Sequence, residues 1–426
     1  DILPFSNRLY SCDFAAADHA LRLVRLYHKP DAERIISWIC AEKPIFLLFS
    51  LQIRLFPSCL LKYVIKIGES ALFPIEKKEK GMRNLDARCG HMITNIGTKV
   101  YAGRLKDRML LRRSSSGGAF VAISDYFLDN NNAVVCAVYD YESHATEFHL
   151  IESKEERDKA IGSKYMQSKP GQVYRDAEKW LKEHSEKKLL FVGMGCQADG
   201  FRKFSEIRGF RERVCVVDII CHGSPSPKLW RKYAESIEKK NGKITYLTFK
   251  DKRNGWKALT AFVTVVGYEY SIKDYVKVFY NRCALRPSCY MCPYATIERK
   301  TDMTIGDFWH IDEMIPDFYD ENGNSLFLIH TDQGEKVFDD IKENLEYRLS
   351  DTKQCRQANL EAPTKKSELR DTFWEDYYRE GIDYIMKKYG KTPLRTKVKN
   401  KLLKFMGGGY TKSNPCYADY SGRRAA

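Results

Sequence analysis

Three features are missing from this sequence: a long uncharged apolar run, closely spaced cysteines in residues 1–97, and an internal repeat. The most apolar stretch, residues 44–68, contains Arg54, Lys62 and Lys66. A transmembrane helix needs about 20 residues almost free of charge, so this stretch fits a buried or amphipathic helix better. Membrane contact is the alternative there. The missing repeat excludes a repeat architecture.

A secretory signal is also missing, because no basic flank followed by an apolar stretch opens the chain. The sequence has 13 cysteines, and an odd number leaves at least one outside any set of disulfides. We therefore expect a cytoplasmic protein, in which clustered cysteines indicate metal binding. Since the chain starts at Asp1 rather than at methionine, it is open whether it is a fragment.

The composition is that of a soluble globular protein, with 43% hydrophobic and 30% charged residues, but the formal charge is +15. Such a charge is typical of proteins that meet nucleic acid, an acidic membrane surface or an acidic partner. Much of the excess lies near the C-terminus, where we favour a solvated helical face. The residues concerned are Lys387, Lys388, Lys391, Arg395, Lys397, Lys399, Lys401 and Lys404.

The chain divides into three regions by pattern. Residues 1–97 have little strand pattern, residues 98–350 alternate apolar strands with helical periodicity, and residues 351–426 have the pattern of basic helices followed by a disordered tail. Two buried strands, LLFVGMGC (189–196) and VCVVDIIC (214–221), are separated by a helix. This order predicts an α/β fold with a largely parallel or mixed central sheet, flanking helices and a helical basic C-terminal extension.

A serine- and glycine-rich turn, Ser114–Gly118, precedes an apolar helical run over residues 119–128. We expect its serines to cap that helix, and its N–H groups and hydroxyls to suit a phosphate-bearing ligand. A capped helix without a ligand is the alternative. Lys164, in GSKYMQS (162–168), is a second candidate that could face a phosphate or the edge of a flavin, unless it is simply solvated.

Four cysteines form the candidate metal site. Cys196 and Cys221 each close an apolar strand, so both should emerge at the carboxyl edge of one sheet. Cys289 and Cys292 form a C-x-x-C motif followed by proline. Four thiolates suffice for one [4Fe–4S] cluster, although zinc binding or a redox pair also fits a C-x-x-C motif.

Three further cysteines have other expected roles. Cys136 and Cys215 lie inside apolar strands and should be core residues, while Cys283 is a possible substitute ligand. His222 follows Cys221 directly and is a candidate proton donor, a hydrogen-bond partner of the site or a structural residue. Asp307 and Trp309, in GDFW, follow a strand and could form a wall of the site.

Seven strings, in this order, resemble the coenzyme F(420) hydrogenase/dehydrogenase beta-subunit family. They are RRSSSGG, GSKYMQS, GMGCQADGF, VDIICHGSPSPKLW, FKDKRNGW, LRPSCYMCPYA and TDMTIGDFW, and they span roughly residues 98–350. GMGCQ stands where the family more often has threonine–proline before the cysteine. Many bacterial relatives carry an N-terminal ferredoxin-like module, and residues 1–97 show no motif of that kind.

The resemblance implies an oxidoreductase in which FAD lies close to one [4Fe–4S] cluster. On this interpretation Cys196, Cys221, Cys289 and Cys292 bind the cluster. Ser115, Ser116, Gly117, Gly118 and Lys164 lie at the flavin, and His222 and Lys164 are the candidate catalytic residues. The implied partners are an electron-transfer protein such as a ferredoxin and a small-molecule or deazaflavin-type substrate.

Two other functions fit parts of the pattern. One is a non-catalytic module with zinc at the four cysteines and a basic surface for nucleic acid, although the lysine-rich tail has few of the aromatic residues that such binding uses. The other is a degenerate relative that keeps the fold and acts as a docking subunit. We expect neither nucleic acid nor a membrane as the partner.

Overall fold

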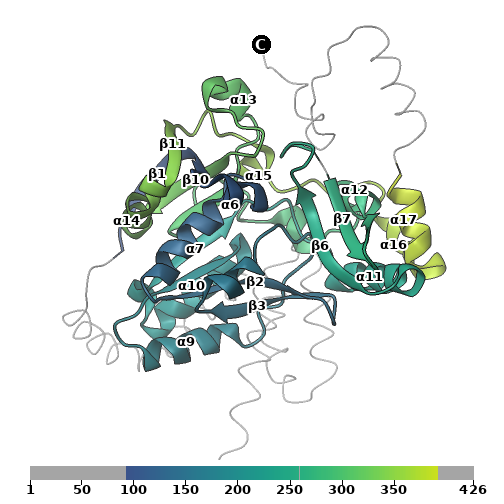
Figure 1. Ribbon diagram of the computed structural model, residues 1–426, viewed down its shortest axis with the longest axis horizontal. Coiled ribbons are helices and arrows are strands. Elements are labelled where there is room, and N and C mark those ends of the chain that lie inside the picture. Colours follow the sequence, from purple (N-terminus) through teal and green to yellow (C-terminus); the bar gives the residue numbers. More distant parts are fainter. Residues whose placement is uncertain (1–92, 259, 392–426) are drawn as a thin grey trace, which may run out of the picture. The chain divides into compact units, whose positions relative to one another are not determined.

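A computed structural model describes residues 93–258 and 260–391 (Figure 1). The apolar stretch at 44–68, nearly all of the proposed region 1–97 and the basic residues after 391 lie outside the described residues. Within them the predicted α/β class is confirmed, since a mixed central sheet is flanked by helices. Among these residues, no helix is both long and apolar enough to cross a membrane.

The central sheet has eight strands in the order β11-β1-β10-β9-β5-β4-β2-β3. Its middle strands β2, β4, β5 and β9 pair in parallel, and the remaining pairings are antiparallel. The strands are β1 (Asn95–Leu105), β2 (Ala133–Asp140), β3 (Ala145–Ile151), β4 (Leu189–Met194), β5 (Val214–Ile219), β9 (Met303–Asp307), β10 (Ser325–Thr331) and β11 (Leu345–Ser350). The parallel strands therefore all end at one edge of the sheet.

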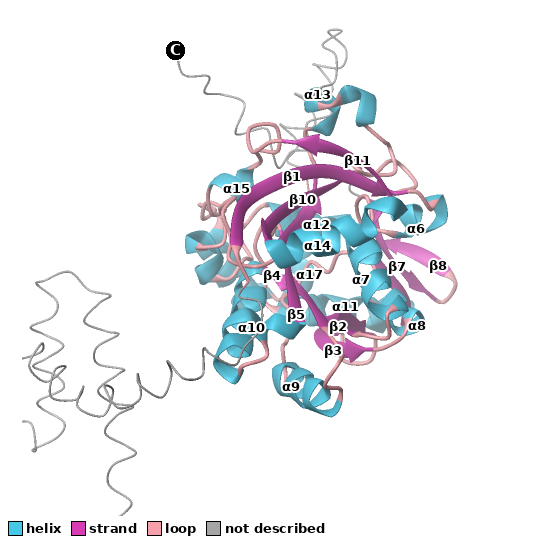
Figure 2. Ribbon diagram, turned by 90° about the vertical axis from the view of Figure 1, so that its left-hand side faces the viewer, coloured by secondary structure: helices cyan, strands magenta, loops and turns pink. Residues whose placement is uncertain are grey.

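Helices cover both faces of this twisted sheet (Figure 2). On one face α7 (Ala119–Asp129) contacts strands β1, β2, β4, β9 and β10, and α14 (Asp332–Ile341) packs beside it. On the other face α10 (Gly195–Arg208) contacts β4 and β5, and α9 (Val173–Glu183) packs beside α10. Successive residues of a strand point to opposite faces of the sheet and so belong to two different cores. Leu190 packs in the core with α7, whereas Phe191 packs in the core with α10.

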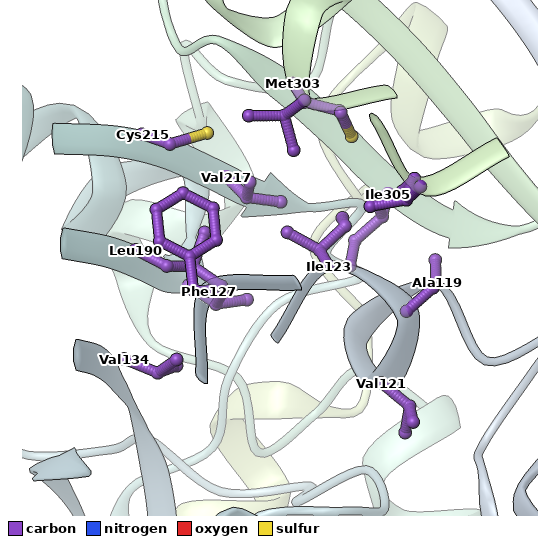
Figure 3. Packing of buried hydrophobic residues seen from close by; sticks show 14 of the residues in the cluster. Ala119, Val121, Ile123, Phe127, Val134, Leu190, Cys215, Val217, Met303 and Ile305 are labelled. Carbon is purple, nitrogen blue, oxygen red and sulfur yellow. The ribbon is translucent and has the colours of Figure 1, made fainter. Parts of the chain in front are cut away.

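The core under α7 is built from continuous apolar contacts between the helix and the parallel strands. Ile123 and Phe127 of α7 lie against Leu190 of β4, Val217 of β5 and Ile305 of β9 (Figure 3). All five side chains are buried. This packing fixes α7, and with it the serine-rich turn at its start, over the parallel strands.

A second, three-stranded antiparallel sheet consists of β6 (Ile244–Asp251), β7 (Thr260–Val265) and β8 (Tyr268–Ser271), with β7 and β8 joined by a tight turn at Gly267. The helices α11 (Pro227–Asn241), α12 (Lys273–Tyr280), α16 (Arg370–Glu380) and α17 (Ile382–Tyr389) lie beside it (Figure 1). Because α17 contacts both α11 and α12, these C-terminal helices belong to the same body as the sheets.

The short helices are α6 (Arg108–Arg113), α8 (Lys154–Asp158), α13 (Ile311–Met314) and α15 (Ala358–Glu361). Two local predictions are wrong. The strand ending at Met194 passes directly into α10, so Cys196 lies in the first turn of a helix and does not close a strand. The serines before α7 do not cap it: Gly118, with φ of 86°, occupies the cap position, and Ala119 N–H is bonded by Ser325 Oγ at 3.4 Å.

The buried face of α7 should dominate the stability of the sheet. We expect Ile123→Ala to lower the free energy of unfolding by about 2–5 kcal/mol, because Ile123 is fully buried and truncation leaves a cavity. Ile207→Ala is the matched control, since Ile207 is 84% exposed on α10 and should change stability by less than about 0.5 kcal/mol. Denaturant titration of both variants checks this, and equal losses would contradict the packing described.

Candidate functional site

A cavity of about 900 Å³ lies over the carboxyl ends of the parallel strands. The ends of three strands line it, namely residues 192–194 of β4, 219–221 in and after β5, and 305–307 of β9. The remaining walls come from the serine-rich turn, the segment around Lys164, helix α12 and the chain after β11. Open α/β sheets bind ligands at this edge, and the volume lies within the range of small-molecule sites.

The serine-rich turn forms one wall of the cavity. Ser115, Ser116 and Gly118 line it, whereas Gly117 does not. A Cβ added at Gly117 would lie 2.3 Å from the carbonyl oxygen of Gly103 and 2.4 Å from the backbone nitrogen of Ser325. Gly117 therefore allows the turn to lie directly on β1 and β10. The turn also bonds through its hydroxyls, with Ser116 donating to the Asn324 carbonyl at 2.8 Å.

Lys252, which follows β6, holds this turn from behind. Its ammonium donates to the carbonyl oxygens of Leu111, Ser116 and Asn322. Burial and, to a smaller extent, the charge of Lys250 lower the pKa of Lys252 to about 7. The smaller sheet thus fixes the position of the serine-rich turn through one buried lysine. Sequence reasoning did not select Lys252, although it lies in the string FKDKRNGW.

Lys164 also lines the cavity, in a segment that contacts this turn. Its ammonium donates to the carbonyl of Ala160 at the end of a short turn, and nearby Ser163 donates to Ser115 at 3.1 Å. Lys164 is half-buried at the wall of the cavity. Burial lowers its pKa to about 8. At neutral pH it is mostly charged, which suits contact with an anionic ligand.

The four candidate ligand cysteines come from three neighbouring segments, one of which lines the cavity. Cys196 starts α10, Cys221 follows β5, and Cys289 lies in the 3-10 helix η4 (Pro287–Met291), with Cys292 directly after it. A Cβ added at Gly223 would lie only 3.3 Å from Cβ of Cys289, so the loop after β5 touches the C-x-x-C segment. Cys221 also lines the cavity and therefore joins the two parts of the site.

The thiols are close enough to act on one another electrostatically. Although Cys196 is exposed as a residue, partial removal of its thiol from water raises its pKa, and the charges of Cys292 and Cys289 raise it further. Burial likewise raises the pKa of Cys221 to about 12, opposed by the Gly223 N–H, which donates to its Sγ at 3.4 Å. Within the part of the chain that the structure describes, no three histidine, cysteine or acidic side chains are grouped closely enough to hold a metal ion. The ligand set stays a prediction.

The other cysteines lie outside this group. Cys136 and Cys215 are buried in the core of the main sheet, as predicted. Cys283, the possible substitute ligand, is buried in the core beside the smaller sheet. Its Sγ lies 3.8 Å from the carbonyl oxygen of Val278, and burial raises its pKa to about 12. Cys283 is therefore a packing residue in this structure.

A buried ion pair anchors the segment that carries the C-x-x-C motif. Arg299 donates to Asp218 of β5 at 2.7 Å, and the two side chains are 3% and 1% exposed. Thr301 donates to the other Asp218 oxygen at 2.7 Å. Arg299 also lies at the start of α10, since a Cβ at Gly195 would be 3.2 Å from its Nη1. One ion pair thus connects β5, α10 and the chain after Cys292.

His222 lines the cavity next to Cys221. Burial lowers its pKa to about 4, the charge of Arg282 lowers it further, and a hydrogen bond with Asn359 opposes this. The imidazole is therefore neutral at pH 7. Its backbone carbonyl accepts from Thr364 at 2.5 Å, which attaches the C-terminal segment to the site.

The cavity is strongly basic. Six basic side chains and, among the described residues, a single acidic one line it. The basic residues are Lys164, Lys277, Arg282, Lys365, Lys388 and Lys391, and the acidic one is Asp307. Lys388 and Lys391 are exposed, as expected of a solvated C-terminal face, and they also line the cavity. Sequence periodicity cannot reveal this, because it says nothing about which distant element a helix faces. Asp307 and Trp309 wall the cavity, as predicted.

The low pKa of Lys252 has a measurable consequence. Unfolding returns the pKa of Lys252 to about 10.5, so between pH 7 and pH 10.5 the unfolded chain binds more protons than the folded one. Stability should therefore rise with pH in this window. We expect the free energy of unfolding of the wild type, relative to Lys252→Met, to increase by about 1 kcal/mol per pH unit above pH 7. Lys239→Met, at an exposed position of α11, controls for loss of a lysine, and a pH-independent difference would contradict the burial of Lys252.

The buried ion pair should matter more than an exposed one. We expect Arg299→Met to lower the free energy of unfolding by about 3–5 kcal/mol, because Asp218 is left buried without its cation. The control is Arg113→Met, which removes the partner of Asp158 from a pair in which Arg113 is 53% exposed and should cost less than about 1 kcal/mol. Chemical denaturation of the two variants distinguishes these outcomes, and a small loss for Arg299→Met would show that the pair is not an anchor.

Comparison with known proteins agrees with the sequence resemblance. Two family models match: the coenzyme F(420) hydrogenase/dehydrogenase beta subunit N-terminal model over residues 100–173 and the C-terminal model over residues 186–354. Among solved structures, one similar chain comes from the xenon-derivatised F(420)-reducing [NiFe] hydrogenase complex of Methanosarcina barkeri. It is 18% identical, with 68% of this chain and 89% of that chain covered and a TM-score of 0.40. No curated protein matches.

The two family models together span more than half of the chain, and residues from both line the cavity, whereas all four candidate cysteines lie in the C-terminal model. The chain therefore belongs to the coenzyme F(420) hydrogenase/dehydrogenase beta-subunit family and is an oxidoreductase.

Proposed function

We propose that the protein is an iron–sulfur flavoprotein that passes electrons between a [4Fe–4S] cluster and a two-electron carrier that reacts at FAD. One observation carries this proposal: a basic cavity adjoins a group of four cysteines, and Cys221 belongs to both. The cysteine group lies within residues 98–350, and the cavity is lined by these residues together with residues from 351–391.

The cavity has the properties that a dinucleotide flavin requires. Its volume of about 900 Å³ suits a large ligand, and its basic residues suit phosphate groups. Ser115 and Ser116 present hydroxyls at one wall and Lys164 presents an ammonium at another. On this proposal Gly118 contributes the left-handed turn that keeps the serines at the wall, and Gly117 contributes the close packing of that turn on the sheet.

The four cysteines fit an iron–sulfur cluster by chemistry and by placement. They provide four thiols from three separate segments, and the Gly223 N–H donates toward Cys221 Sγ, a type of bond that tunes cluster potentials. When bound, a flavin handles paired electrons and a cluster handles single ones, so their combination couples the two kinds of transfer. Cys221, placed between the cysteine group and the cavity, gives the shortest protein connection between them.

The polar residues of the cavity have distinct proposed roles. Lys164 Nζ holds a proton at neutral pH and releases it near pH 8, so it can balance negative charge at the ligand. His222 is neutral and cannot supply charge, but its imidazole can hydrogen-bond the ligand. Exclusion of water is the role of the apolar wall, which includes Phe120, Val192 and Ile305.

The proposed electron donor or acceptor is a separate electron-transfer protein such as a ferredoxin. Cys196 is exposed, and Met291, inside the C-x-x-C motif, is 77% exposed. A cluster held by these cysteines would lie near the protein surface, where a partner can reach it. The second reactant, a deazaflavin-type or other anionic two-electron carrier, would enter the basic cavity.

Metal and flavin analysis after anaerobic purification tests the proposal. We expect about four irons and one flavin per chain. Cys221→Ser and Cys292→Ser should lose most of the iron, because each removes one thiolate ligand. Cys283→Ala is the control and should retain its iron, since Cys283 is buried in the core away from the group.

Other outcomes would point elsewhere. Stoichiometric zinc without flavin would replace the redox proposal with a zinc-binding module. Cofactor-free protein that still assembles with a partner would indicate a docking subunit. Iron that is retained in both cysteine variants would refute the ligand set while leaving the flavin open.

A further inference from the structure

Three buried polar atoms of the cavity residues have no hydrogen-bond partner within the described part of the chain: His222 Nε2, Ser224 Oγ and Asp307 Oδ1. Ser224 is only 4% exposed. Leaving a buried polar atom unpaired costs about 1–3 kcal/mol, and nearly all such atoms in native proteins are paired. Three of them around one cavity indicate that a bound ligand completes their hydrogen bonds.

Asp307 is held in one orientation by its surroundings. Lys250 donates to Asp307 Oδ2 at 2.6 Å, and the side chain of Lys250 is 2% exposed. The Lys250 ammonium lies 4.5 Å from the ring centre of Trp309 and 5.1 Å from that of Trp256. One oxygen of Asp307 is therefore engaged by a fixed cation, and the other is left for the cavity.

The sheet places Asp307 beside the loop that carries the other two atoms. In the parallel pairing of β5 with β9, Ile219 lies opposite Ile305, and Ile220 N–H donates to the Ile305 carbonyl at 2.9 Å. Cys221 comes two residues after Ile219, and Asp307 comes two residues after Ile305, so the two lie at matching positions of the paired strands. His222 and Ser224 come next along the same loop, so the three unpaired atoms belong to adjacent strand ends.

The chemistry of these groups restricts the ligand. A carboxylate only accepts hydrogen bonds, a hydroxyl donates and accepts, and a neutral imidazole can do either. Asp307 is also the single acidic residue among the described residues of a basic cavity, so it does not serve to bind an anion. Its free oxygen requires an N–H or O–H donor, and an imide provides such a donor between two acceptor oxygens.

Resting on the proposed function, we propose that Asp307 accepts a hydrogen bond from the imide N–H of the bound flavin ring. Ser224 and His222 bond the polar edge of the same ring. Lys250 is the positioning residue for Asp307, since it fixes the carboxylate without contacting the cavity. The pair therefore selects flavins with an unsubstituted imide.

The test compares FAD with FAD methylated at its imide nitrogen, using anaerobically purified full-length chain stripped of flavin. The methylated form cannot donate to Asp307. We expect the wild type to bind it about ten- to a hundredfold more weakly than FAD, as for loss of a hydrogen bond to a charged acceptor. Fluorescence titration of the flavin gives both dissociation constants.

The decisive variant is Asp307→Ala combined with Lys250→Met, which removes the carboxylate without leaving a buried cation. It should bind the two flavins with equal affinity within about threefold. The matched control combines Asp339→Ala with Lys342→Met, an exposed pair 2.8 Å apart, and should discriminate like the wild type. If the double variant does not fold, Asp307→Asn is used instead; it should weaken FAD binding by about tenfold and leave the methylated form unaffected.

The outcomes separate the two proposals. Equal affinity of the wild type for both flavins, or unchanged discrimination in the double variant, would overturn the role of Asp307 while the flavin function stands. A wild-type protein that binds neither flavin would instead refute the proposed function itself.

Discussion

The parallel pairing of β2, β4, β5 and β9 is the constraint on which the rest of the structure depends. It brings the carboxyl ends of these strands to one edge, where the segment that follows each strand leaves the sheet. Cys196, Cys221 and Asp307 all come from such continuations, although they are far apart in sequence. The C-x-x-C segment reaches this edge through the buried ion pair of Arg299 with Asp218.

The smaller sheet depends on the same edge and supports two walls of the cavity, although none of its own described residues lines it. Two lysines at its first strand carry the connection: Lys250 pairs with Asp307, and Lys252 bonds the carbonyls behind the serine-rich turn. Both ammonium groups are largely removed from solvent, which is costly unless their partners are well placed. The two sheets therefore support opposite sides of one cavity through short polar contacts rather than through a broad apolar interface alone.

Much of this arrangement could be predicted from the sequence. The apolar runs ending near Met194 and Ile219 are sufficient to predict two neighbouring parallel strands. Of the wall residues, Ser115 precedes a helix and His222 follows a strand, whereas Lys164 lies in the loop between α8 and α9. The order of seven motifs along the chain identified the family.

The remaining features depend on contacts between distant segments, which local patterns do not encode. The serine cap failed because Ser325, far along the chain, bonds the first N–H of α7 and leaves Gly118 to set the turn. The sequence does not distinguish Lys252 from any other charged residue of a turn, because its three carbonyl partners lie in distant segments of the chain. Lys388 is exposed, as its pattern indicates, but it also lines the cavity because its helix packs on α12, more than a hundred positions earlier in the chain.

The C-terminal wall of the cavity also sets an order of events during synthesis. Residues 95–350 contain both sheets, but Asn359, Thr364 and the end of α17 leave the ribosome after them. Domains generally begin to fold as they emerge, N-terminal parts first. The sheet edge consequently forms without its C-terminal wall, which the segment after β11 and the end of α17 add when they dock. A large cofactor has unobstructed access to the growing chain only before that final step.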